Sequence, residues 1–321
     1  MKQAPLPELR ERTAGEILDA AIKVWGANIG VLAATAGVLL LPFQLLGAWV
    51  LDLMRPTMFD EITRVRALAA DGVASKLSIT SRMALGVVAD FAIGSLGWVL
   101  VAATAAFFVG ELYTTSSART AAGLMPAANA TARSKASPRP LLGVVLRRSH
   151  IILGTQVSVA IITLLIGMAV ILPIGLLGAL TGLSGLAPAS SVAGSTAMAV
   201  TYLLLRCGTP GLMCERTGII GTLKRSVFLA RKKRRSIIGV SLMLSIVTSI
   251  PNQVITEIVR AGLTALGGNN SAFDVLWSGI ARSVGGAFCT PIAAIGAVYL
   301  YFSLRLRNGE SLLPGDPPIL G

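Results

Sequence analysis

Polar side chains inside long apolar stretches are the residues of this sequence whose chemistry needs explaining. Asp90 and Glu257 fall within or at the end of such stretches, and Gln44 falls in another, two residues after Pro42. A polar or ionisable group at membrane depth is costly, so it normally faces a polar partner or a water-filled cavity. These three residues are the candidate intramembrane polar site. The alternatives are ordinary interhelical hydrogen bonding and contact with the membrane interface.

A catalytic or metal-binding set is not evident in the sequence. Metal-assisted hydrolysis needs several converging carboxylates, usually with histidines, whereas this chain has a single histidine, His150, at the edge of an apolar stretch. Cys207, Cys214 and Cys289 lack the spacing of a zinc site or of a disulfide framework. The sequence has neither a phosphate-binding loop nor a nucleophile elbow. We therefore expect no enzyme activity, no metal and no cofactor.

Transmembrane helices are the elements that must position the polar candidates. Of the 321 residues, 54% are hydrophobic and 13% are charged, about half the charged share of a soluble domain. Because a span needs about 20 mainly apolar residues, the sequence predicts an all-α polytopic membrane protein with one domain over residues 1–307. The six predicted spans are 29–53, 84–109, 151–180, 187–205, 236–259 and 285–304.

The positions of the cations predict the orientation of the spans. Because each span crosses the membrane once, every second connecting segment lies on the same side as both termini. Most of the 28 Lys and Arg residues lie in these segments and in the termini. By the positive-inside rule this side is cytoplasmic. We therefore expect a multi-pass protein of the cytoplasmic (inner) membrane with both termini inside, and a disordered cytoplasmic tail at 308–321.

Amphipathic segments precede the odd-numbered spans. In TAGEILDAAIKVWG, apolar residues recur at helical spacing with Glu16, Asp19 and Lys23 opposite, and Thr13 with Glu16 fits a capping box. TGIIGTLKRSVFLARKKRRS precedes the fifth span, and RPLLGVVLRRSHIIL precedes the third. We predict three transmembrane hairpins, each preceded by a cytoplasmic interfacial amphipathic helix.

A cationic cluster before the fifth span is the candidate contact with a partner. It comprises Lys224, Arg225, Arg231, Lys232, Lys233, Arg234 and Arg235. Each cation near an anionic membrane surface adds about 1 kcal/mol of attraction. We expect membrane lipids with anionic headgroups to be the partner, with lipid regulation or a protein partner in the membrane as alternatives. Nucleic acid is not expected, because no recognition fold accompanies the cations.

The fourth predicted span, which includes ASSVAGSTAMAVTYLLL, is rich in small residues. Small residues allow helix backbones to approach closely in lipid, so we expect this span to pack centrally. Each odd-numbered span also contains one internal proline, at Pro42, Pro173 or Pro251. A proline in a transmembrane helix removes one backbone donor, and neighbouring helices can satisfy the freed carbonyl.

Four features carry a family resemblance: GEILDAAIKVWGANIGVL, TPGLMCERTGIIGTLKRSVFLARKKRRSIIGV, the proline-bearing hairpins and VYLYFSLRLRNGE. Together they resemble the membrane domain of glycerophosphoryl diester phosphodiesterase, a bacterial six-span family abundant in actinobacteria. Some members continue into a soluble barrel with the phosphodiesterase active site, and these 321 residues hold none. The resemblance therefore implies a bacterial membrane location but no activity. Ser303 stands where the family commonly has an aspartate.

Three functions fit these observations. A non-enzymatic scaffold or accessory subunit of the bacterial cell envelope agrees with the missing catalytic set and is the main expectation. A transporter or exporter of a small lipid, peptide or metabolite is the alternative, and it requires a polar cavity near the bilayer midplane. An intramembrane lipid enzyme would require clustered acidic, basic or histidine side chains at one depth.

Overall fold

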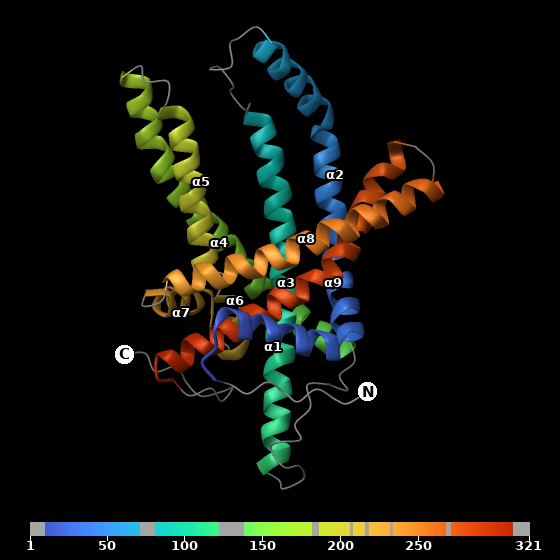
Figure 1. Ribbon diagram of the computed structural model, residues 1–321, viewed down its shortest axis with the longest axis vertical. Helices are drawn as coiled ribbons and strands as arrows, with labels where there is room; N and C mark the ends of the chain where they lie inside the picture. The colour runs from blue at the N-terminus through green and yellow to red at the C-terminus, as the bar shows by residue number, and fades with distance from the viewer. Residues whose placement is uncertain are drawn as a thin grey trace.

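The computed structural model is helical throughout the parts that it describes, which are residues 10–70, 81–121, 138–181, 186–205, 208–215, 218–231, 234–267 and 271–310. This confirms the all-α class. In chain order the helices are α1 (Ala14–Ala27), α2 (Ile29–Ala70), α3 (Ser81–Ala121), α4 (Pro138–Thr181), α5 (Leu186–Leu205), α6 (Gly208–Glu215), α7 (Ile219–Arg231), α8 (Arg234–Gly267) and α9 (Ser271–Arg307). Figure 1 shows how they are arranged.

Five of the described helices are long and apolar enough to cross a membrane. Their apolar segments are Ile29–Leu53, Ala92–Tyr113, Leu141–Gly178, Arg234–Leu266 and Asp274–Arg307. The chain is therefore a candidate multi-pass membrane protein. The fourth predicted span falls in α5, which is a helix but is not one of these five. Helices α2 and α3 extend well beyond the predicted spans, to Ala70 and Ala121.

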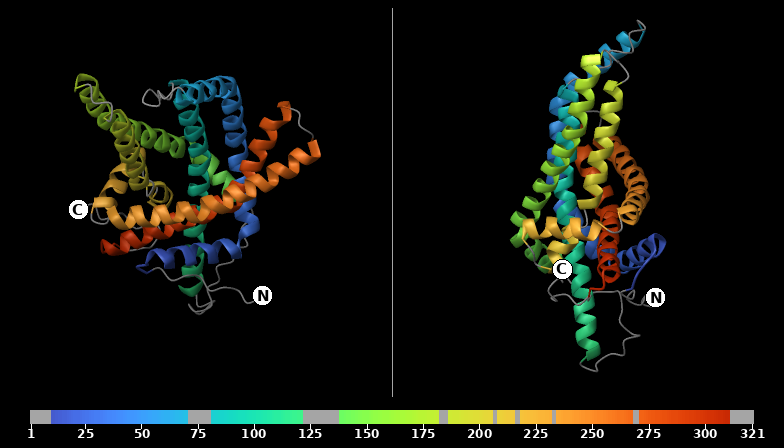
Figure 2. Two further views of the ribbon diagram at one scale, coloured as in Figure 1. Left: turned by 45° about the horizontal axis from the view of Figure 1, so that its top comes forward. Right: turned by 90° about the vertical axis from the view of Figure 1, so that its left-hand side faces the viewer.

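Helix α9 is the central element of the bundle. It packs against α2, α3 and α8, and it also contacts α1. Every residue from Ala293 to Arg305 is buried, as is every residue from Val99 to Ala106 of α3. Figures 1 and 2 show α8 and α9 side by side, running obliquely across α2 and α3. Because this segment is buried against several neighbours, its polar side chains, such as Ser303 and Arg305, need partners inside the protein.

The hairpin of α4 and α5 lies at the periphery, so the predicted central position of the small-residue span is wrong. Helix α5 packs mainly on α4, and the pair projects away from the other helices in Figure 1. The small residues do allow close approach, because a methyl group added at Gly167 or Gly194 would collide with Met198 or Ile171. Small residues therefore set the spacing of this hairpin rather than its place in the bundle.

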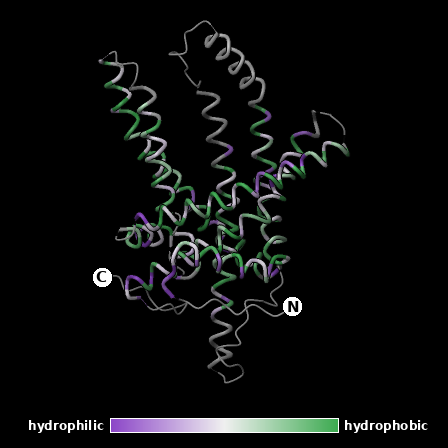
Figure 3. Tube along the Cα trace, viewed as in Figure 1, coloured by the Kyte–Doolittle hydropathy of each residue, from purple (hydrophilic) through white to green (hydrophobic). Residues whose placement is uncertain are grey.

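Large apolar side chains are exposed along the outer helices. On α4 they include Leu165, Leu172 and Leu176, and on α8 they include Ile250 and Ile258. Figure 3 shows hydrophobic residues along α4, α5 and α8, and hydrophilic residues near the end of α9. An apolar surface of this extent is unfavourable in water and suits contact with lipid.

Two of the three predicted interfacial helices are separate elements. Helix α1 begins at the predicted capping box, where the Thr13 N–H donates to Glu16 Oε2 at 2.8 Å and the Glu16 N–H donates to Thr13 Oγ1 at 3.4 Å. It ends at Asn28, whose side-chain amide donates to the Val24 carbonyl. Helix α7 is likewise distinct. The third predicted segment is instead the first part of the continuous helix α4, because no comparable capping residue interrupts it.

The start of the predicted disordered tail is ordered. Asn308 and Gly309 form a turn, in which Gly309 has a φ of 74° that favours glycine, and Glu310 is buried. Residues 311–321 lie outside the described part of the chain. The turn redirects the chain after α9, so that Glu310 lies against α7 and α9 rather than in solvent.

Candidate functional site

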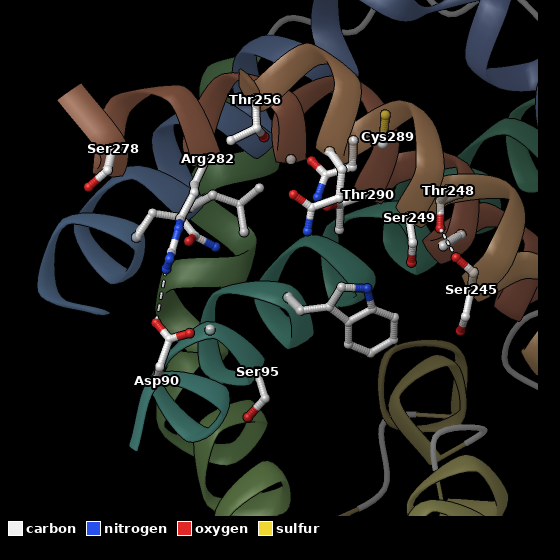
Figure 4. Close-up of a pocket in the computed structure, with 18 of the residues that line it drawn as sticks. Asp90, Ser95, Ser245, Thr248, Ser249, Thr256, Ser278, Arg282, Cys289 and Thr290 are labelled. Atoms are coloured by element: carbon white, nitrogen blue, oxygen red, sulfur yellow. Dashed lines mark hydrogen bonds and ion pairs between the residues drawn. The ribbon is translucent and has the colours of Figure 1, made fainter. Parts of the chain in front are cut away.

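A polar cavity of about 560 Å³ lies among α2, α3, α8 and α9, within the range typical of small-molecule sites. Tyr202 of α5 also lines it. Figure 4 shows side chains from α3, α8 and α9 around this space. The serine and threonine residues among those lining it are Ser95, Ser245, Thr248, Ser249, Thr256, Ser278 and Thr290.

The three polar candidates of the sequence all line this cavity. Gln44 comes from α2, Asp90 from α3 and Glu257 from α8. Glu257 pairs with Arg260 one turn later, with 3.4 Å between Oε2 and Nε, and both side chains are about half exposed. The fold thus brings together three residues that are far apart in the sequence. Their functional role remains a prediction.

Asp90 is held by Arg282 of α9. Arg282 Nη1 donates to Asp90 Oδ1 at 3.1 Å, and each side chain is about one third exposed. Figure 4 shows this ion pair at one side of the cavity. The carboxylate also lies against α2, because a methyl group built on Gly47 would be 2.8 Å from Asp90 Oδ1. A glycine at position 47 therefore leaves space for the carboxylate.

Arg282 was missed by the sequence analysis. It lies three residues before the predicted sixth span, so it was assigned to a loop, whereas α9 begins at Ser271. The available signal was the apolar pattern that continues on both sides of Arg282. A cation inside such a pattern normally needs a carboxylate partner.

Prolines occur beside the cavity in three of the helices that line it: Pro42, Pro251 and Pro291. Each lies within two residues of a lining residue, namely Gln44, Asn252 or Thr290. Proline has no N–H, so the carbonyl four residues earlier cannot receive its usual helical hydrogen bond. Helices α2, α8 and α9 nevertheless continue through these prolines, so the prolines weaken the backbone hydrogen bonding beside the cavity without breaking a helix.

A second polar centre lies where α6, α7 and the end of α9 meet. Arg225 Nη1 donates to Glu310 Oε1 at 2.8 Å, and Arg225 Nε donates to Glu215 Oε1 at 3.1 Å. Arg305 Nε donates to Glu310 Oε2 at 3.2 Å, and the Tyr301 hydroxyl donates to Glu215. The four charged side chains are only 1% to 4% exposed. We call this group, with Tyr301, the buried charge cluster.

Two positive and two negative charges balance within the buried charge cluster, which is the arrangement that makes burial of charge tolerable. Burial alone would lower the pKa of Arg225. The hydrogen bond with Glu310 and the charge of Glu215 outweigh burial, so the pKa of this guanidinium is raised. Arg225 is therefore a firmly charged part of the protein interior.

The prediction that Arg225 contacts lipid is wrong for the same reason, since its side chain faces the two glutamates inside the protein. Of the other predicted lipid contacts, Lys224, Arg234 and Arg235 are exposed. The side chain of Arg231 and residues 232–233 lie outside what the structure describes. Lys224, Arg234 and Arg235 are called the cationic corner below.

Ser303 has a structural contact of its own. Its hydroxyl oxygen accepts a hydrogen bond of 3.2 Å from the Arg12 N–H, and Arg307 donates to the Arg12 carbonyl at 3.0 Å. The segment before α1 is thus fixed to the end of α9. The Arg12 guanidinium also lies 5.5 Å from the ring centre of Tyr299, within the range of a cation–π contact.

Comparisons with protein-family models, with curated proteins and with solved structures find no match for this chain. The resemblance to the membrane domain of glycerophosphoryl diester phosphodiesterase therefore stays a prediction. Among the described residues, no group of three His, Cys, Asp or Glu side chains could hold a metal ion. The polar cavity is the candidate functional site, and binding of a solute is the chemistry that its lining can perform.

Proposed function

We propose that this chain is a multi-pass transport protein that moves a small polar or amphiphilic solute through the cavity among α2, α3, α8 and α9. The polar lining of that cavity is the observation that carries the proposal. Gln44, Asn252 and Thr290 lie near the middle of three candidate spans. Transporter sites commonly occupy this depth.

The proposed topology has six spans, with α5 as the fourth, in three hairpins: α2 with α3, α4 with α5, and α8 with α9. The contact of Arg12 with Ser303 and Arg307 supports a location of both ends of the chain on one side. The excess of cations on that side supports the cytoplasm. The family resemblance supports a bacterial cytoplasmic membrane.

Movement in this proposal involves the ion pair between Asp90 and Arg282, which joins α3 to α9. Solute that enters the cavity competes for these side chains, so the hairpin of α8 and α9 can shift relative to α2 and α3. Rocking of one hairpin or repeat against another around a fixed site is a common mode of alternating access. A scaffold needs no such internal polar surface.

A scaffold or accessory subunit is the second candidate, and the cationic corner favours it. Arg234 and Arg235 are exposed at the start of α8, and Lys224 is exposed on the preceding helix α7. They suit anionic headgroups or an acidic protein partner, and contact with either requires no transport. We propose no enzymatic function and no nucleic-acid partner.

Accessibility of the cavity from both sides of the membrane tests transport against scaffold. Ser249 is exposed in the cavity wall, so Ser249→Cys is made in a background without Cys207, Cys214 and Cys289. A membrane-impermeant maleimide is added inside or outside proteoliposomes. Transport predicts labelling from both sides.

Ser195→Cys is the matched control. Ser195 is exposed on α5 and does not line the cavity, so its thiol should face lipid and react slowly from either side. Labelling of Ser249→Cys at the slow rate of this control would contradict a water-filled cavity and would leave the scaffold as the remaining candidate function. Labelling from one side only, under every solute tested, would contradict alternating access.

A further inference from the structure

Three hydroxyl groups of the cavity wall already donate to backbone carbonyls. Thr248 Oγ1 donates to the Leu244 carbonyl at 2.7 Å, and Ser95 Oγ donates to the Ala92 carbonyl at 2.7 Å. Ser278 donates similarly, at 2.9 Å. A hydroxyl has one O–H donor and two acceptor lone pairs. These three oxygens therefore offer a solute acceptors and no donor.

Other lining groups add both donors and acceptors, because the amides of Gln44 and Gln253 can donate as well as accept. Asp90 and Glu257 accept hydrogen bonds only, when ionised. The Oδ1 atom of Asn252 is buried and has no hydrogen-bond partner within the part of the chain that the structure describes. This oxygen lies against Gly285 of α9, because a methyl group built there would be 2.7 Å from it, so it belongs to the contact between α8 and α9 and is not open to the cavity.

The described charges of the lining cancel. Asp90 and Glu257 carry two negative charges, and Arg260 and Arg282 carry two positive charges. Each guanidinium is engaged by one of the carboxylates. An anion could bind an arginine only by breaking the ion pair of that arginine with its carboxylate. A cation could bind a carboxylate only by displacing the arginine that is paired with it. The lining therefore favours a solute without net charge.

From these observations we propose that the cavity binds a net-uncharged polyol, either as a free solute or as the headgroup of a lipid. This rests on the proposed transport function and names its substrate class. Hydroxyl groups of the polyol donate to the hydroxyl oxygens of Thr248, Ser95 and Ser278. The aromatic side chains of Trp98 and Tyr202, which line the same cavity, supply apolar surface for its C–H groups.

Thermal unfolding of the protein in detergent measures binding, because a ligand of the folded state raises the Tm by an amount that grows with the logarithm of its concentration above the Kd. A polyoxyethylene detergent is required, since a sugar-headed detergent is itself a polyol. The probes are maltose, trace dodecyl maltoside, spermidine and inorganic phosphate. Maltose and dodecyl maltoside share one headgroup, so their comparison separates a free solute from a lipid headgroup.

Protection by maltose supports a free solute, and protection by dodecyl maltoside alone supports a lipid headgroup. Protection only by spermidine or phosphate, or by none of the probes, would overturn the proposal. If Ser249→Cys is still labelled from both sides, such a result rejects only the polyol and leaves transport standing. Loss of two-sided labelling rejects transport itself.

Thr248→Val tests the acceptor role directly. It keeps the side-chain shape and removes the oxygen, and loss of one hydrogen bond should weaken the apparent affinity for the polyol about 3- to 10-fold. Thr248→Ser restores the oxygen and should restore affinity. Thr264→Val is the matched control, because Thr264 makes the same bond on α8, to the Arg260 carbonyl at 2.8 Å, and does not line the cavity. Equal weakening by both valine variants would contradict a direct contact at Thr248.

Discussion

Arg282 and Asp90 are 192 positions apart in the sequence, and their side chains meet at 3.1 Å between Nη1 and Oδ1. This contact is a direct link between α9 and α3 at the cavity. Both side chains remain about one third exposed, so the pair is reachable by a solute. The ion pair is therefore part of the cavity wall and is not buried in the protein core.

Asp90→Asn and Arg282→Gln should each lower the Tm, because each leaves the partner charge without its counterion. The double variant should recover part of the loss, with a coupling energy of about 1 kcal/mol. Thermal unfolding of the four proteins in one detergent measures this. Strictly additive effects would show that the pair contributes no coupling.

Gly47→Ala should disturb the same pair from the α2 side. The added methyl group would lie 2.8 Å from Asp90 Oδ1, closer than such contacts allow, so the carboxylate must move. We expect altered labelling of Ser249→Cys with little change in net helix content. Gly30→Ala is the control on the same helix, because a methyl group there meets nothing within 4 Å. Similar labelling in both variants would contradict the effect.

Glu310→Gln should strongly destabilise the protein, because it leaves Arg225 and Arg305 with one carboxylate between them. Loss of one partner from a buried ion pair typically costs about 3–5 kcal/mol. Chemical unfolding monitored by circular dichroism measures this loss. Glu11→Gln is the control, since Glu11 pairs with Arg307 at 3.4 Å but is 60% exposed. A small effect at both positions would show that the buried charge cluster is not required for stability.

Neutralising the cationic corner should reduce association with anionic lipid. The variant changes Lys224, Arg234 and Arg235 to Gln and should retain less phosphatidylglycerol, with unchanged phosphatidylcholine, in native mass spectrometry. The charge-conserving control exchanges Lys for Arg and Arg for Lys at the same positions. If both variants retained phosphatidylglycerol equally, charge at this corner would not be the cause of binding.

Acid should loosen the start of α1. The backbone hydrogen bond from Thr13 to Glu16 lowers the pKa of this carboxyl in the folded protein. A lowered folded pKa stabilises the fold above the unfolded pKa, and this contribution is lost as the pH falls through the folded value. The protection factors of the first α1 amides, which are the intrinsic exchange rates at each pH divided by the observed rates, should fall over that interval. Glu16→Gln should remove this pH dependence, and its persistence would point to another group.

Parts of the fold were predictable from local patterns. The apolar stretches marked the membrane helices, and Thr13 with Glu16 marked the start of α1, because capping depends only on neighbours in the sequence. The cost of polar groups at membrane depth identified Gln44, Asp90 and Glu257. These three side chains line one cavity because of the packing between helices, which sequence periodicity alone does not determine.

Other parts depended on contacts between distant segments. Glu310 belongs to a polar stretch typical of a tail, and its burial requires Arg225, 85 positions earlier. The small residues of α5 do not by themselves predict its peripheral position, because the central helix α9 also has small residues that permit close packing. One of them is Gly285, where an added methyl group would lie 2.7 Å from Asn252 Oδ1 of α8. Which helix lies at the centre of the bundle depends on packing between helices, not on composition.

The buried charge cluster also constrains the order in which the protein can mature. Glu215, Arg225 and Arg305 are synthesised before Glu310, which enters the cluster only after the whole of α9 has been made. Before α9 is made, Arg225 can pair only with Glu215, and Arg305 and Glu310 join them later as a second pair of opposite charges. Closure of the cluster is therefore a late step, and it couples completion of the last membrane helix to docking of α7 during biosynthesis.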